Sequence, residues 1–152
     1  MEELEKKLRV LSDIARVFNE NHLVWAVGAS MLLYFKGKTD SFHDLDLMVL
    51  EDDADKAERL LSPMGVPAPP NPNERYRTRR FLEYTIGGVE VDVLAGFVIV
   101  RDGVEYDCSL RPKEIAEYIR VNGQTVPLQS LDAWRRYYSL MGRTEKAEMI
   151  DR

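Results

Sequence analysis

Apolar residues recur along the chain with two different periods, and the period predicts the element that each segment forms. Near the start they return every three or four positions, the spacing of one helix face, at Leu4, Leu8, Leu11, Ile14, Ala15 and Phe18. We expect this helix to end near Asn19–His22. The next apolar run, Leu23–Val27, is short and ends at a glycine, which predicts a buried strand.

The rest of the chain alternates between helix and strand patterns separated by turn residues. The further predicted helices are Ala29–Phe35, Ala54–Leu61 capped by Asp52 or Asp53, Pro112–Tyr118, Ser130–Leu140 and a last helix capped by Thr144. The further predicted strands are Asp44–Leu50, Arg79–Ile86, Val89–Leu94 and Phe97–Val100, with Tyr106 on a return strand. The expected turns are Gly87-Gly88, Asp102-Gly103 and Asn122-Gly123, and the expected loop is Ser62–Asn73. This order predicts an α+β (α/β-like) fold with helices flanking a mixed β-sheet.

Length and apolar content indicate the class of protein. The 152 residues predict a single domain over residues 1–152. Cys108 is the one cysteine, so no internal disulfide forms, which is compatible with a reducing compartment. The charged start lacks a secretory signal core, and the longest apolar stretch, Leu23–Phe35, is shorter than the about 20 residues of a membrane span. We therefore expect a cytoplasmic protein without membrane contact.

Charge is distributed unevenly, although the formal net charge is only −5. Residues 40–58 hold eight carboxylates against one lysine, and residues 71–84 hold four arginines against two glutamates. Two interpretations stay open: a metal site facing a phosphate site, or two solvated faces of opposite sign, which charge alone favours. Arg77, Arg79 and Arg80 are candidates to meet phosphate or an acidic acceptor, or are simply exposed strand arginines.

The segment Asp44-Leu45-Asp46 lies on the predicted strand Asp44–Leu50. Side chains alternate along a strand, so Asp44 and Asp46 are expected on one side and Leu45 on the other. Two neighbouring carboxylates repel each other unless they are solvated or share a divalent cation, and Mg²⁺ prefers such hard oxygen ligands. A solvated acidic pair and a metal site both remain open on this motif alone.

A third carboxylate, Asp92, lies between aliphatic residues on a later predicted strand. Strand interiors disfavour aspartate, and a buried carboxylate needs a partner. On a solvent-exposed edge strand, Asp92 and Glu90 would instead share the exposed face. Near Asp44 and Asp46, Asp92 would complete a site in which two metal ions clamp the oxygens of a phosphoryl displacement.

A strand-to-helix junction occurs at Val27-Gly28-Ala29-Ser30. Glycine lets a ligand approach the backbone, the N–H groups of a helix start attract phosphate, and Ser30 adds a hydroxyl. The alternative is a plain turn, because the glycine-lysine-serine/threonine ending of a P-loop is missing. The junction by itself does not indicate a phosphate site, and it favours one only in combination with the carboxylates.

In combination, these residues resemble the polymerase-β-like nucleotidyltransferase superfamily. Its pattern is a hydrophobic residue, Gly, then Gly or Ser, followed by Asp-x-Asp/Glu on the next strand and a later acidic residue. Here Val27–Leu50 carries the first part and Val91-Asp92-Val93 the last. The tail, Pro127–Trp134 and then Met141-Gly142-Arg143, is similar to the end of small prokaryotic members, among them minimal and toxin–antitoxin types. The resemblance covers most of the chain and implies the nucleotidyltransferase fold.

The resemblance also implies a reaction, in which a nucleoside monophosphate is transferred from a triphosphate such as ATP to an acceptor and pyrophosphate is released. Asp44 and Asp46 would bind two Mg²⁺ ions with the nucleoside triphosphate. Asp92 would ligate the second ion and help to deprotonate the attacking hydroxyl. Gly28 and Ser30 would hold the β- and γ-phosphates.

The chain departs from the family in two segments. Small members place Arg or Lys and Ser or Thr close before the first Asp; here Lys38, Thr39 and Ser41 are the candidates, in a longer segment that ends at His43. Lys38 is the residue that we expect to contact the nucleotide. Where related chains have lysine-aspartate after glycine-arginine, this chain reads Thr144–Ala147, which weakens any role for the tail.

Other functions stay open at this stage. The fold can serve as an inactive binding or regulatory module, such as a toxin–antitoxin component beside a small helical protein partner. A metal-dependent glycosyltransferase also uses Asp-x-Asp but needs no Gly-x-Ser before it. Three acceptors stay open: a protein hydroxyl, an RNA end or a small molecule such as an antibiotic. A homodimer that forms the acceptor-binding cleft between its subunits also stays open.

Overall fold

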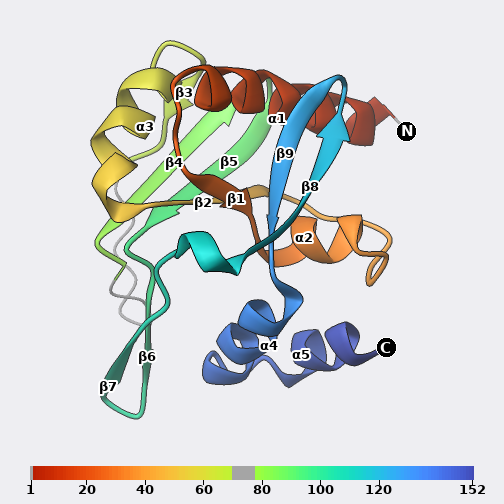
Figure 1. Cartoon of the computed structure of the whole chain (residues 1–152), viewed down its shortest axis with the longest axis vertical. Coiled ribbons are helices and arrows are strands. Elements are labelled where there is room, and N and C mark those ends of the chain that lie inside the picture. Colours follow the sequence, from red (N-terminus) through yellow and green to blue (C-terminus); the bar gives the residue numbers. More distant parts are fainter. Residues whose placement is uncertain (1, 70–77) are drawn as a thin grey trace.

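A computed structural model of the chain describes residues 2–69 and 78–152 (Figure 1). Within these residues, seven strands form one sheet. In spatial order they are β3 (Val66–Pro67), β4 (Arg80–Ile86), β5 (Val89–Ala95), β2 (Leu45–Val49), β1 (Trp25–Val27), β9 (Gln124–Gln129) and β8 (Ile115–Val121). The pairs β2–β5 and β1–β9 are parallel and the other neighbours are antiparallel, so the predicted mixed sheet is confirmed.

The α-helices of the described residues pack around this sheet. They are α1 (Glu2–Glu20), α2 (Ala29–Phe35), α3 (Ala54–Leu61), α4 (Leu131–Leu140) and α5 (Thr144–Asp151). Helix α1 contacts β5, β8 and β9, α3 contacts β4 and α1, α2 contacts β2 and α4, and α5 packs on α4. Figure 1 shows α1 and α3 at one end of the molecule and α4 and α5 at the other. Judged on the described residues, none of these helices has the length and apolar character of a membrane span.

Segments with a clear local pattern fold as predicted. Helix α1 buries the predicted stripe, including Leu11, Ile14 and Phe18, and α2 and α3 begin and end where expected. Both residues of each central turn have positive φ: 56° and 79° at Gly87-Gly88, and 48° and 83° at Asn122-Gly123. Such turns match the twist of the paired strands, which explains why these short sequences mark hairpins reliably.

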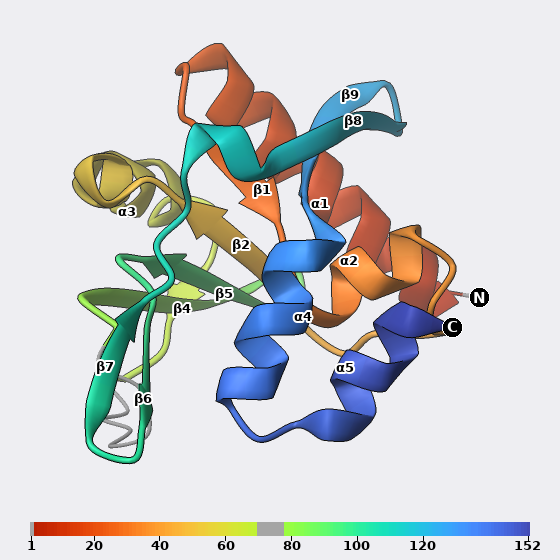
Figure 2. The same cartoon turned by 60° about the horizontal axis from the view of Figure 1, so that its bottom comes forward.

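Strands β6 (Val98–Arg101) and β7 (Val104–Asp107) form a separate two-stranded sheet, turned at Asp102-Gly103 as predicted. The hairpin projects beyond the main sheet (Figures 1 and 2). Arg101 anchors it, because its guanidinium donates hydrogen bonds to the carbonyl oxygens of Ser139 and Leu140. The hairpin is thereby tied to the C-terminal end of α4.

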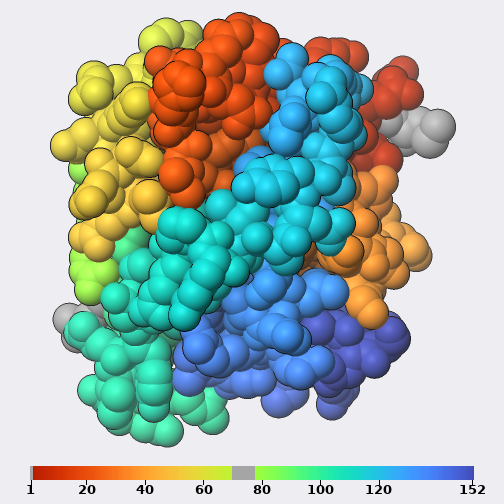
Figure 3. Space-filling model, viewed as in Figure 1, coloured from red at the N-terminus to blue at the C-terminus, as the bar shows by residue number. Residues whose placement is uncertain are grey.

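The helix predicted over Pro112–Tyr118 is wrong. A single turn of 3-10 helix, η2 (Pro112–Glu114), leads directly into β8, whose residues alternate between partly buried and exposed. Its partner across the Asn122-Gly123 turn is β9, and Figure 3 shows the two strands crossing the surface between α1 and α4. Pairing with β9 satisfies the backbone of β8, and this tertiary contact overrides the helix-like composition.

The loop predicted over Ser62–Asn73 contains the short strand β3. Val66 and Pro67 pair with Thr85 and Tyr84 of β4 at the edge of the sheet. Proline is tolerated there because an edge strand needs no donor on its outer side. Residues 70–73 of the predicted loop lie outside the described residues.

Two predicted caps make other contacts. A 3-10 turn, η1 (Glu51–Asp53), precedes α3, and Asp53 occupies its N-cap position. The Asp53 carboxylate caps no helix N–H; it accepts a hydrogen bond from the Val24 backbone N–H at 3.2 Å. Asp53 therefore ties the start of α3 to the entry of β1. At α5 the N-cap residue is Arg143, and Thr144 is the first helical residue.

Trp134 of α4 packs directly onto the junction between β1 and α2. Its ring centroid lies 6.0 Å from that of Phe97 and 5.3 Å from that of Tyr138, and its Nε1 donates a 2.8 Å hydrogen bond to Gln129 Oε1. A Cβ atom on Gly28 would lie 2.6–2.8 Å from indole atoms. Glycine at this position therefore lets α4 approach the junction closely.

Replacing Gly28 by Ala places a methyl group against the Trp134 indole. We expect the free energy of unfolding to fall by about 1–3 kcal/mol, the usual cost of overpacking a core, as measured by urea denaturation. In a Trp134→Leu background the ring is gone, so most of the added cost of Gly28→Ala should disappear. An equal cost in both backgrounds would mean that contact with Trp134 does not explain the glycine.

Candidate active site

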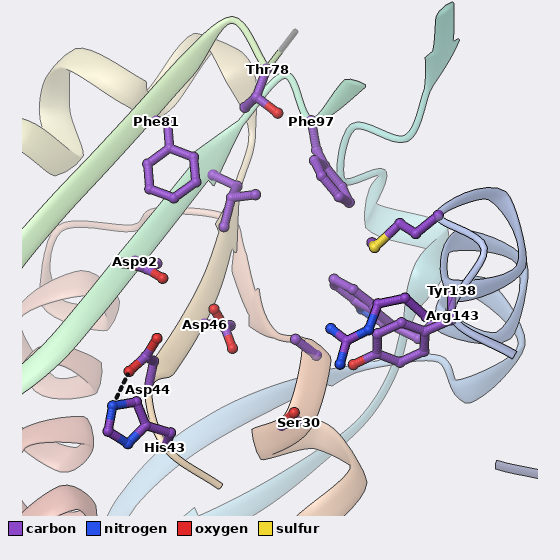
Figure 4. A pocket seen from close by; sticks show the side chains of 14 residues that line it. Ser30, His43, Asp44, Asp46, Thr78, Phe81, Asp92, Phe97, Tyr138 and Arg143 are labelled. Carbon is purple, nitrogen blue, oxygen red and sulfur yellow. Dashed lines mark ion pairs between the residues drawn. The ribbon is translucent and has the colours of Figure 1, made fainter. Parts of the chain in front are cut away.

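Asp44, Asp46 and Asp92, the three carboxylates predicted to act together, line one pocket of about 290 Å³. The parallel register of β2 and β5 places Asp46 directly beside Asp92, and Asp44 immediately precedes β2. Figure 4 shows the three side chains around the same space. The fold thus brings Asp92 together with two carboxylates that are far from it in the sequence.

The rest of the pocket wall is mainly aromatic and aliphatic, with one arginine. Phe97 comes from the segment before β6, Trp134 and Tyr138 come from α4, and Arg143 precedes α5. In Figure 4, Phe97, Tyr138 and Arg143 lie across the pocket from the carboxylates. The Arg143 guanidinium lies 5.7 Å from the Tyr138 ring centroid, a cation–π distance. The remaining lining residues are Ala29, Ser30, His43, Thr78, Phe81, Leu94 and Met141.

Burial and like charge raise the pKa of all three aspartates. Burial, with a contribution from Asp44, raises the pKa of Asp92 to about 7. Burial and then the charge of Asp92 raise the pKa of Asp46 well above its ordinary value, while Lys146 opposes the rise. Burial also raises the pKa of Asp44, and the Glu90 carboxyl adds to it. Carboxylates in one desolvated pocket resist ionising together, and a divalent cation would remove this penalty.

His43 and Glu90 extend the acidic side of the pocket towards solvent. His43 Nε2 lies 3.5 Å from both Asp44 Oδ1 and Glu90 Oε2. One potential ligand atom from each of these three residues lies within 4.8 Å of the others. Asp44 Oδ1 is buried and accepts no hydrogen bond from any residue that the structure describes. Apart from the His43 ring at 3.5 Å, this oxygen could therefore accept a cation.

The backbone at the start of α2 adopts a strained conformation. The Gly28 N–H donates to the Asp46 carbonyl oxygen at 3.0 Å, which ties the junction to β2. Ala29 has φ of 53°, in the left-handed region, where a residue with a Cβ atom costs about 1–2 kcal/mol. Strain of this kind clusters at functional sites. Here it accompanies the placement of Ser30 at the pocket.

Two lysines differ in where the fold puts them. Lys38, expected at the nucleotide, is not among the residues that line the pocket, and its Nζ donates to the backbone carbonyl of Arg152 at 2.9 Å. Lys146 of α5 instead donates to the Ser30 hydroxyl at 3.2 Å. The roles assigned to Gly28, Ser30 and Lys38 in holding phosphate remain predictions.

Arg79 and Arg80 make ion pairs outside the pocket. The Arg79 guanidinium donates to Glu51 Oε1 at 3.1 Å and lies 3.9 Å from Asp107 Oδ1. Arg80 pairs with two carboxylates of α3. Arg77 lies outside the described residues. For Arg79 and Arg80, the opposite charges seen in the sequence thus meet in ion pairs at the surface.

The family model of the aminoglycoside-2''-adenylyltransferases matches residues 10–152. The chain belongs to this family. It is therefore a nucleotidyltransferase, as the resemblance of its carboxylates and Gly-x-Ser junction predicted. The alternative of an inactive module is not favoured by this membership.

Solved structures share the fold of this adenylyltransferase family member. TM1012 from Thermotoga maritima, described provisionally as a nucleotidyltransferase, is 25% identical with a TM-score of 0.75, over 95% of this chain and 89% of that chain. ANT(2'')-Ia in complex with adenylyl-2''-tobramycin is 13% identical with a TM-score of 0.64. The match covers 94% of this chain and 86% of that chain. The solution structure of ANT(2'')-Ia is 14% identical with a TM-score of 0.57. The match covers 99% of this chain and 89% of that chain. No curated protein sequence matches this chain.

Sequence reasoning missed three parts of the site. Glu90 shares the face of Asp92 by the two-residue period, which was the available signal. The aromatic wall follows from how α4 packs, and no local pattern marks it. Lys146 lies in a tail that departs from the family order, and no spacing rule connects it to Ser30.

Replacing Asp92 by Asn removes a carboxyl whose pKa in the folded protein, about 7, lies above its ordinary value of 3.8. Such a group stabilises the fold below about pH 4 and loses that contribution as the pH rises through about 7, because the folded state then holds a buried charge. Without divalent cations, Asp92→Asn should raise the free energy of unfolding at about pH 8 by about 2 kcal/mol, a value reduced for solvent screening.

Urea denaturation across this pH range measures the effect. The exposed Asp40 provides the control, since Asp40→Asn makes the same change of charge away from the pocket and should leave the pH dependence unaltered. A loss of stability in Asp92→Asn at every pH would contradict the assignment of a buried, repelled carboxyl.

Proposed function

We propose that this enzyme transfers the adenylyl group of ATP to a hydroxyl group of an aminoglycoside in a reaction that requires Mg²⁺. The observation that carries the proposal is the placement of Asp46 beside Asp92, with Asp44 at the same pocket. The family description supports adenylyl transfer and this class of acceptor.

The donor set of the pocket fits divalent cations. Three carboxylates converge there, burial raises the pKa of each, and Asp44 Oδ1 has no hydrogen-bond partner among the described residues. Carboxylates together with substrate phosphates are the ligands that Mg²⁺ prefers. In the proposal, Asp44 and Asp46 hold two ions with the triphosphate, and Asp92 ligates one of them. Bound Mg²⁺ would neutralise charge that develops on the transferred phosphoryl group.

In the proposed reaction, the acceptor hydroxyl oxygen forms a bond to the α-phosphorus of ATP as the bond from that phosphorus to pyrophosphate breaks. The bonding electrons leave with pyrophosphate. The hydroxyl proton passes to the carboxylate of Asp92, which lines the pocket beside Asp46. The Ser30 hydroxyl, at the pocket wall, donates a hydrogen bond to the phosphates and helps to orient them.

The face of β4 and β5 beside the pocket suits a polycationic acceptor. Glu83 lies opposite Asp92 in the register of the two strands, and Glu90 shares the face of Asp92 two residues before it. Both charges contribute to the raised pKa of Asp92, so they act on the same space. Phe81, exposed at the pocket wall, offers apolar surface to a sugar ring. Amino groups of an aminoglycoside would be attracted to these carboxylates.

Several expectations lie beyond this proposal. A toxin–antitoxin role, a small helical partner and a homodimer stay predictions, as do the cytoplasmic location and the single-domain organisation. A protein hydroxyl and an RNA end are the competing acceptors, and the activity assay distinguishes them from an aminoglycoside.

The purified protein should release pyrophosphate from ATP and Mg²⁺ when an aminoglycoside such as tobramycin is added, and mass spectrometry should detect the adenylylated product. Asp44→Asn/Asp46→Asn should lower the rate by at least about 100-fold, because the lost ligands remove several kcal/mol of charge stabilisation. Asp40→Asn should keep the wild-type rate. Adenylylation of protein or RNA but not of any aminoglycoside, or a rate indifferent to Mg²⁺, would overturn the proposal.

Replacing Glu83 or Glu90 by Gln should raise the KM for the aminoglycoside by about two- to fivefold, the size expected of exposed ion pairs. Glu83→Gln, which is outside the cluster of His43, Asp44 and Glu90, should leave the KM for ATP unchanged. Salt should raise the acceptor KM less in these variants than in the wild type, since fewer charges are left to screen. Glu3→Gln at the exposed start of α1 is the matched control. An unchanged acceptor KM in both variants would exclude this face from acceptor binding.

A further inference from the structure

Helix α5, near the far end of the chain, places the ammonium group of Lys146 against a residue of the pocket wall. Lys146 Nζ donates a partly buried 3.2 Å hydrogen bond to the hydroxyl of Ser30, which lines the pocket. The charge of Lys146 also favours the ionised form of Asp46. Lys146 is therefore bonded to the start of α2 and close enough to Asp46 for its charge to act on that carboxyl.

Several contacts fix the position of α5. Ile150 is buried, Arg135 of α4 pairs with Asp151, and Lys38 donates to the Arg152 carbonyl oxygen. Lys146 is itself only partly exposed. Its ammonium group is thus held by a docked helix and differs from a freely moving surface lysine.

This location is suited to an anion. An ammonium group has three donors, and the bond to Ser30 uses one of them. A polyphosphate entering beside three carboxylates would meet strong repulsion unless cations flank it on more than one side. Arg143 also lines the pocket but is engaged by the Tyr138 ring and by an ion pair with Glu145 at 3.6 Å.

We propose that Lys146, together with Ser30, binds the β- and γ-phosphates of the donor nucleotide. The inference rests on the proposed function and adds a binding residue from α5. It assigns to Lys146 the contact that the sequence order suggested for Lys38. A lysine–phosphate contact is a charge-assisted hydrogen bond, about twice as strong as a neutral one.

Titration calorimetry of ATP and AMP in the presence of Mg²⁺ tests the proposal. Lys146→Gln should weaken ATP binding by about tenfold or more and change AMP binding by less than about twofold, because AMP lacks the two phosphates. Lys146→Arg keeps the charge and should restore most of the ATP affinity. Inhibition by pyrophosphate, measured as Ki, should weaken in Lys146→Gln to the same extent as ATP binding.

Arg135→Gln is the matched control, because it removes one positive charge and one contact of α5 but does not reach the pocket. It should leave the affinity for ATP unchanged. Lys146→Gln and Arg135→Gln could both weaken the binding of ATP and of AMP to the same extent. Lys146 would then act only by docking α5, and the inference would be wrong.

Two further outcomes separate this inference from the proposed function. Wild-type ATP affinity in Lys146→Gln would overturn the inference and leave the proposed reaction intact. A wild-type protein that bound no nucleoside triphosphate in Mg²⁺ would overturn the proposed function and the inference with it.

Discussion

The parallel pairing of β2 with β5 places Asp46 beside Asp92 within one sheet, and the rest of the site depends on this arrangement. Two carboxylates on adjacent strands repel each other, and burial of the pocket makes the repulsion stronger. The fold tolerates the pair because protons, Lys146 or a cation can offset its charge. In the proposed function, the repulsion between these carboxylates favours the binding of divalent cations, so stability and function oppose each other at these positions.

Aromatic packing from α4 holds the other half of the pocket. Trp134 is oriented by its bond to Gln129 and lies against Gly28, so the position of α4 and the shape of the β1–α2 junction are coupled. The left-handed backbone at Ala29 persists within this packed environment. Rigid support of this kind keeps Ser30 and the carboxylates in a fixed relation, which phosphoryl transfer requires because catalysis there is mostly positioning and charge stabilisation.

Elements with a clear pattern of their own could be predicted from the sequence, and two strands without such a pattern, β3 and β8, could not. The apolar stripe of α1 and the turns at Gly87-Gly88 and Asn122-Gly123 depend only on residues close together in the sequence. Their patterns therefore predict the structure directly. Strand β8 pairs with β9 across the Asn122-Gly123 turn, and the edge strand β3 pairs with β4; their own residues have a mixed or proline-rich pattern. Hydrogen bonding to a partner strand, and not the segment's own pattern, decided the structure of both segments.

The sequence by itself determined which carboxylates are available, their order along the chain and the Gly-x-Ser junction before them. Only the tertiary structure decided which strands pair, and hence that Asp46 and Asp92 are neighbours. It also decided that Lys146, 116 positions from Ser30, donates a hydrogen bond to that residue of the pocket wall while Lys38 contacts Arg152. The physical reason is that helix docking and strand register decide which groups a side chain can contact. Both depend on many weak contacts across the whole chain, and no single position of the sequence shows them.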